Sequence, residues 1–109
     1  MDDLEIKERR KSKAYLICLE ELNLFRTELI KHQTKSQMNR QEAVNLKDLA
    51  HRIKGSMGFF GFSKLEILAG KLESQLLNYI ENNNKLNTES LIKDAIEELN
   101  RLLSEEANA

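Results

Sequence analysis

Apolar residues recur along the chain at steps of three and four, the spacing that places them on one face of an α-helix. The pattern predicts four helices, the first running from about Leu4 to Lys35. The second is expected after Asn39, the third from Ser63, and the fourth from Asn87 or Thr88. The four apolar stripes are Tyr15, Cys18, Leu22, Phe25 and Leu29; Leu46, Leu49, Ala50, Ile53 and Met57; Leu65, Leu68, Ala69, Leu72 and Leu76; and Leu91, Ala95, Leu99 and Leu102.

Short polar or glycine-bearing segments separate the predicted helices. They are Thr34–Gln37, Gly58–Phe62 and Asn82–Asn84. Asn39 precedes Glu42, and Ser63 precedes Glu66, by the three residues of a capping box, in which side chains satisfy free amides at a helix start. One apolar stripe per helix and short breaks between helices predict an all-α fold, an up-down-up-down antiparallel four-helix bundle.

Composition agrees with a single helical domain. The chain has 109 residues, no proline and only four glycines, which disfavours a fold of many strands and tight turns. Apolar residues make up 40% of it and charged residues 32%, too apolar for disorder and too charged for a membrane span. We expect one domain over residues 1–109, with residues 1–12 as a flexible or helical lead-in.

Charge and cysteine usage restrict the location and the partners. The net charge of −1 gives no general attraction to nucleic acid or anionic lipid. The basic run Lys7–Lys13 leaves such binding as an alternative. Acidic Glu5 and Glu8 lie before and within this run, so we expect a solvated helix end or a flexible lead-in. The lone Cys18 cannot form an internal disulfide, and no signal peptide or membrane-spanning run is found. A cytoplasmic protein is expected, and the initiator Met1 favours a free-standing one.

His51 departs from the core pattern of its helix. With Leu46 at zero and about 100° per residue, the stripe falls within about 60° of zero, whereas His51 lies at about 140°. His51 is therefore expected to point away from the core, although a plain surface histidine is an alternative. The other histidine, His32, is expected to be an ordinary residue of a helix C-terminal turn.

The glycines cluster after His51. Gly55 and Gly58 lie about one and two turns further along the same helix, and glycine inside a helix costs about 1 kcal/mol relative to alanine. We expect missing side chains there to open the imidazole to a bulky group or another protein, with helix-end fraying as the alternative for Gly58. Gly61 is expected to turn the chain. Gly70, at about 140° from its own stripe, is expected to keep the adjoining surface low.

The chemistry expected at this face is phosphoryl acceptance. An exposed neutral imidazole is a good nucleophile near neutral pH. Lys54 at i+3 and Lys47 at i−4 are helix neighbours of His51. Their ammonium groups would favour an incoming phosphoryl group and stabilise the phosphohistidine that results.

These residues resemble the signature of histidine-containing phosphotransfer (HPt) domains. That signature is roughly A-H-x-L-K-G-S-S, followed by a glycine, a leucine and a Leu-Glu pair. The matching positions are Leu49–Ser56, Gly61, Leu65, Leu72 and Glu73. The motif covers about 25 residues, and the bundle pattern suits the family over most of the chain.

The resemblance implies a four-helix bundle in which His51 is the phosphorylation site. It implies that Lys54 contacts the phosphoryl group and that Gly55 leaves space for it, while Ser56 matches the first serine of the signature. The other matching residues occupy mainly structural positions of the family: Gly61, Leu65, Leu72 and Glu73.

Two residues depart from the signature. Met57 replaces the usual second small polar residue, and Phe62 replaces the usual alanine after glycine. Both are expected to change packing near the turn rather than the chemistry.

The expected function is that of a phosphorelay intermediate. A response-regulator receiver would pass a phosphoryl group from phospho-aspartate to His51, which passes it to another receiver; a hybrid sensor kinase is the other expected partner. Lys47, Ser56 and Gly58 are expected in supporting roles. We expect a monomer with no cofactor of its own, because Mg²⁺ belongs on the receiver. Without a P-loop or nucleotide lid, it should neither bind ATP nor phosphorylate itself.

The main alternative is a non-catalytic helical interaction module with His51 as a plain surface residue. A metal site is weaker, because His51 has no His or Cys partner at i+3 or i+4. Nucleic-acid binding would depend on Lys7–Lys13 alone.

Overall fold

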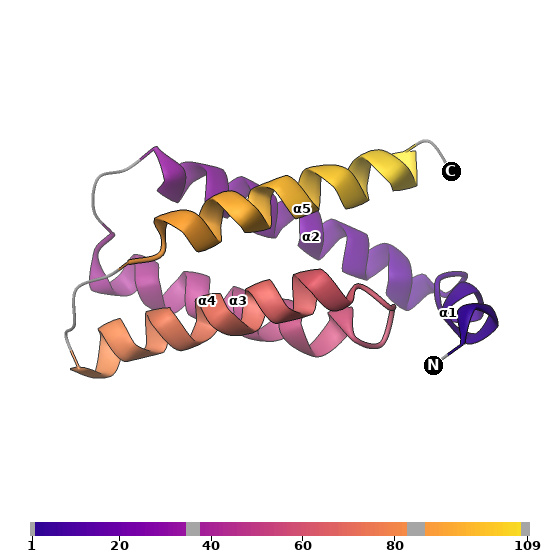
Figure 1. Cartoon of the computed structure of the whole chain (residues 1–109), viewed down its shortest axis with the longest axis horizontal. Helices are drawn as coiled ribbons and strands as arrows, with labels where there is room; N and C mark the ends of the chain where they lie inside the picture. Colours follow the sequence, from indigo (N-terminus) through magenta and orange to yellow (C-terminus); the bar gives the residue numbers. More distant parts are fainter. Residues whose placement is uncertain (1, 35–37, 83–86, 108–109) are drawn as a thin grey trace.

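The computed structural model is all-helical over the residues it describes, 2–34, 38–82 and 87–107. Within these ranges, four long helices pack around a shared core, and a short helix, α1, lies at one end of the molecule (Figure 1). In Figure 1, successive long helices run in alternating directions. The helices are α1, Asp3–Arg9; α2, Lys13–Gln33; α3, Arg40–Met57; α4, Ser63–Asn82; and α5, Glu89–Ala107.

The predicted first helix is wrong in one respect, because it is two helices. α1 ends at Arg9, and α2 begins after Ser12, whose side chain accepts a hydrogen bond from the Tyr15 amide. Ser12 is therefore an N-cap inside a segment that sequence periodicity had treated as continuous. The predicted end at Lys35 lies outside the described residues, as do parts of the Thr34–Gln37 and Asn82–Asn84 breaks.

One of the two predicted capping boxes is confirmed. The Asn39 side chain accepts from the Glu42 amide, and the Glu42 carboxylate accepts from the Asn39 amide, so α3 has a fixed start. The box predicted at Ser63 is wrong. The Glu66 amide donates instead to the carbonyl of Phe62, and Ser63 is already the first residue of α4.

The predicted stripes form the core. Every residue predicted in the stripes of α2, α3 and α4 is buried, and α3 packs most extensively against α4. In α5, Leu91 is only partly buried, and Ile92 and Ile96 join the core beside Ala95 and Leu99. Cys18 is a buried free thiol whose pKa burial raises to about 11, together with the nearby Glu21 carboxylate. No helix among the described ranges has the length and apolar character needed to cross a membrane.

The turn between α3 and α4 depends on Gly61. Its φ is +82°, a left-handed conformation that disfavours residues with a Cβ, so the predicted turn role is confirmed. A Cβ at Gly61 would also stand 2.8 Å from the Ile6 side chain. Met57 and Phe62, the two departures from the HPt signature, are both buried beside this turn and fill the core.

α1 is held against this turn by two arginines. Arg9 Nη1 donates to the Phe59 carbonyl at 3.1 Å, and Arg10 Nε donates to the Phe60 carbonyl at 3.0 Å. The Arg9 guanidinium lies 4.2 Å from the centre of the Phe59 ring, and that of Arg10 lies 4.3 Å from the centre of the Phe62 ring. The lead-in is therefore a packed element: its arginines stabilise carbonyls at the end of α3 and contact the aromatic side chains of the turn.

Replacing Arg10 with alanine should lower the free energy of unfolding by about 1–2 kcal/mol, because a charged hydrogen bond and a cation–π contact are both lost. Chemical denaturation followed by circular dichroism measures this change. Lys11→Ala is the matched control, since Lys11 is exposed and its side chain pairs with Glu8 three residues away. Its effect should stay within about 0.5 kcal/mol. Equal effects of the two substitutions would contradict the anchoring role of Arg10.

Candidate functional site

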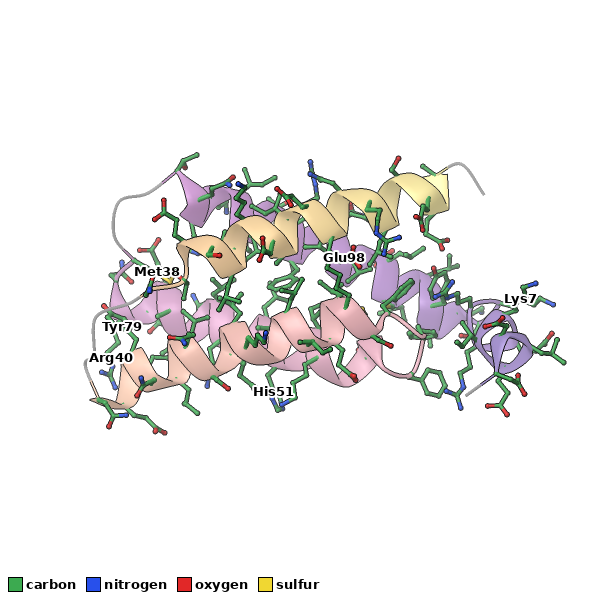
Figure 2. All side chains as sticks on the ribbon, viewed as in Figure 1. Lys7, Met38, Arg40, His51, Tyr79 and Glu98 are labelled. Atoms are coloured by element: carbon green, nitrogen blue, oxygen red, sulfur yellow. The ribbon has the colours of Figure 1, made fainter. Side chains whose placement is uncertain are left out.

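The site lies on the outer side of α3, where it faces α4. His51 is in the middle of α3, and 69% of its side chain is exposed. Figure 2 shows its imidazole projecting outward from the bundle. The prediction that His51 points away from the core is therefore confirmed.

Glu73 on α4 holds both His51 and Lys54. Its Oε2 contacts His51 Nδ1, and its Oε1 accepts a hydrogen bond from Lys54 Nζ at 3.1 Å. A carboxylate at Nδ1 favours the proton on that nitrogen, which leaves a lone pair on Nε2 at the opposite edge of the exposed ring. The contact between Glu73 Oε2 and His51 Nδ1 thus orients the imidazole and leaves Nε2 as the nitrogen that can react.

The charge of Glu73 is stabilised by these partners. Only 16% of its side chain is exposed, and partial burial alone would raise the pKa of its carboxyl group. Hydrogen bonds from Lys54 and His51, with the positive charges of both, outweigh burial and hold the pKa of Glu73 below its usual value. The lowered pKa keeps Glu73 in its carboxylate form, which accepts from Lys54 Nζ and contacts His51 Nδ1.

The glycines around the site have different surroundings. A Cβ on Gly55 would meet no atom of the described residues within 4 Å, so no packing contact among them requires a glycine there. Gly58, by contrast, lies beneath Glu66, whose carboxylate oxygen would be 2.2 Å from such a Cβ. The open surface next to His51 therefore belongs to Gly55, whereas the space above Gly58 is filled.

Two residues expected in supporting roles have other partners. Lys47 Nζ pairs with Asp48 at 2.9 Å, and Ser56 Oγ donates to the Arg52 carbonyl at 3.1 Å within α3. Of the two lysines, Lys54 is the one that binds Glu73, and Glu73 also contacts His51.

Glu73 is the residue whose importance the sequence reasoning missed, because its match to the HPt signature suggested a structural position. A signal was available in the antiparallel register. His51 and Glu73 lie symmetrically about Phe62 in the sequence, as do Lys54 and Gly70, and Gly58 and Glu66. His51 contacts Glu73 directly, and in the other two pairs a Cβ added to the glycine would contact the partner residue. A helical hairpin centred on this turn therefore places Glu73 opposite His51.

Within the described ranges, no group of three or more His, Cys, Asp or Glu side chains is arranged to hold a metal ion. The chemical groups that the site combines are an oriented imidazole, a shared carboxylate and one ammonium group. This combination suits nucleophilic attack by nitrogen on an anionic electrophile.

The pKa of Glu73 should be measurably below that of an ordinary glutamate, and Lys54→Ala should raise it, because one hydrogen bond and one positive charge are removed. Carboxyl-carbon NMR during a pH titration measures both values. Since the folded pKa is the lowered one, the stabilisation from Glu73 should be present above the usual glutamate pKa and be lost as pH falls through the folded value. An unchanged Glu73 midpoint in Lys54→Ala would contradict this assignment.

Comparison with known proteins identifies one family. Comparison with curated proteins and with solved structures finds no match. The family model described as Hpt domain matches residues 18–108, which is most of the chain and includes α3, α4 and α5 in full; α1 precedes it. Hpt domains are modules of phosphotransfer in phosphorelay signalling. The site built around His51 thus lies within a chain that belongs to the Hpt domain family.

Proposed function

We propose that this protein is a phosphorelay intermediate in which His51 accepts a phosphoryl group from the phospho-aspartate of a receiver domain and passes it to another receiver. The observation that carries the proposal is the arrangement at His51: Glu73 holds Nδ1, and the opposite edge of the ring is exposed. Lys54 supplies a positive charge nearby, and the open surface at Gly55 gives a partner protein room to approach.

The proposed transfer is an in-line displacement at phosphorus. The Nε2 lone pair of His51 forms a bond to phosphorus as the bond from phosphorus to the aspartyl oxygen breaks, and the aspartate leaves as a carboxylate. The Nδ1 proton stays directed at Glu73, whose negative charge stabilises the positive charge that develops on the ring. Lys54 offsets the charge of the arriving phosphoryl group, and Mg²⁺ is expected on the receiver.

The reverse step uses the same atoms. A second receiver's aspartate attacks phosphorus, the bond from phosphorus to Nε2 breaks, and the neutral imidazole is regenerated with Glu73 still at Nδ1. The alternating directions of α2 to α5 and their common core support the up-down-up-down four-helix bundle as the scaffold (Figure 1). Receivers and a hybrid sensor kinase are the proposed partners, while a cytoplasmic location and a monomeric state stay predictions.

His51→Gln should abolish phosphoryl acceptance from a phosphorylated receiver, because no nucleophilic ring nitrogen is left at the site. Transfer of radiolabelled phosphate, with the acid lability of the product as a check for phosphohistidine, measures this. His32→Gln is the control, since His32 is the other histidine of the chain and lies in the C-terminal turn of α2. Label that persists on His51→Gln would disprove the assignment, and failure with every receiver tested would favour a non-catalytic interaction module.

Gly55→Leu should block transfer from a receiver while keeping the helix content, because its side chain would project into open space where a partner docks. Loss of the glycine should even raise stability by about 0.5–1 kcal/mol. The control is Gln41→Leu, an equally exposed position near the start of α3 and well removed from His51. Transfer rates and circular dichroism spectra of both variants test this, and unimpaired transfer by Gly55→Leu would contradict the docking role.

A further inference from the structure

Gly70 lies in the interior of α4, where nothing in the backbone requires a glycine. It is eight residues into a helix that continues to Asn82, and it does not adopt a left-handed conformation. Among the described residues outside its own stretch of α4, a Cβ built on Gly70 would have one neighbour within 4 Å, the Cδ atom of Lys54 at 3.5 Å. The space above Gly70 is therefore bordered by the aliphatic chain of the lysine that belongs to the site.

The path of Lys54 explains this neighbour. Lys54 projects from α3, its Cδ is next to Gly70, and its Nζ reaches Glu73, which lies about one turn further along α4. A Cβ at 3.5 Å would make an ordinary contact, so alanine fits. A side chain that extends beyond Cβ would compete with the lysine chain for the same space.

We infer that Gly70 is a positioning residue: it leaves free the surface of α4 along which the Lys54 side chain passes, so that the ammonium group reaches Glu73 beside His51. The placement of Lys54 follows from contacts within the chain, whereas its consequence for phosphoryl transfer rests on the proposed function of His51.

Displacing Lys54 would alter the site without touching His51. Glu73 would lose the hydrogen bond at Oε1 and keep its contact to Nδ1. The groups facing Glu73 from α3 are His51 and Lys54. Removal of the lysine therefore leaves the His51 ring as the remaining partner of Glu73 among the described groups that set its pKa. The ammonium group would then no longer be held where the phosphoryl group arrives.

A different role for Gly70 makes a different prediction. Gly70 also borders a shallow hollow between α4 and the start of α5, which is lined by Ile67, Lys71, Ser74, Gln75, Asn87 and Leu91. If Gly70 only kept this surface open to a partner, a large side chain would impair docking whether or not Lys54 is present. The two roles therefore separate in a double-mutant cycle with Lys54.

The first arm of the test needs no partner protein. The Glu73 carboxyl carbon is titrated by NMR in the full chain and in Gly70→Leu, Gly70→Gln, Lys54→Ala and the double variant Gly70→Leu/Lys54→Ala. The Glu73 midpoint should rise in either Gly70 variant by as much as in Lys54→Ala, with no further rise in the double variant. Gly70→Ala should leave the midpoint unchanged. Circular dichroism establishes that each variant is folded. If Gly70→Leu is unfolded, Gly70→Gln takes its place in the comparison.

The second arm measures the transfer rate from a phosphorylated receiver. Gly70→Leu should slow transfer by the same factor as Lys54→Ala, and the double variant should be no slower than Lys54→Ala. Glu81→Leu, a change to the same side chain at an exposed position of α4 outside this hollow, should transfer at the normal rate.

Two results would overturn the inference: a Glu73 midpoint that does not move in Gly70→Leu, or a double variant that transfers more slowly than Lys54→Ala. The latter would assign Gly70 to the docking surface. If no variant, nor the original chain, accepts a phosphoryl group, the proposed function of His51 fails, and the titration arm still decides the role of Gly70.

Discussion

The reversal of the chain at Gly61 determines which residues of α3 and α4 face each other. Its left-handed backbone conformation closes a tight connection, so residues symmetrically placed about Phe62 meet across the two helices. This register brings Glu73 to His51 and Gly70 to Lys54. A shift of one residue would rotate Glu73 by about 100° around α4 and remove it from both partners. The chemistry proposed for His51 therefore depends on a turn that lies more than two helical turns away.

α1 and its arginines stabilise that turn from outside the region matched by the family. The carbonyls of Phe59 and Phe60 follow the end of α3, where a helix leaves backbone acceptors without partners inside the helix. Arg9 and Arg10 donate to these two carbonyls, and Ile6 packs on Gly61. The positive charges also suit the negative end of the α3 dipole. Support for the end of the His51 helix thus comes from residues that the sequence pattern assigned to a solvated lead-in.

The residues that could be predicted from the sequence are those whose position follows from their own helix. The burial of Leu46 or Leu72 and the exposure of His51 depend on angles around one axis, and these were predicted correctly. The role of Glu73 depends on the register between two helices, which no single helical wheel contains. The helix break at Ser12 was missed because no proline or glycine marks it in the sequence. It is accompanied by contacts from Arg9 and Arg10 to a turn 50 residues away, which a single helix pattern does not contain either.

The electrostatics of the site favour a lysine that is held loosely rather than one that is buried. In the proposed transfer, Glu73 at Nδ1 orients His51, but its negative charge would oppose the arrival of an anionic phosphoryl group nearby. Lys54 pairs with Glu73, and 47% of its side chain is exposed. In the proposed transfer, this exposure would let its ammonium group shift toward the phosphoryl oxygens. A lysine enclosed by a bulky neighbour on α4 would lack this freedom. The inferred role of Gly70 and the proposed role of Gly55 therefore serve the same transfer: Gly70 leaves space for the Lys54 side chain on α4, and Gly55 would leave space on α3 for the incoming phosphoryl group.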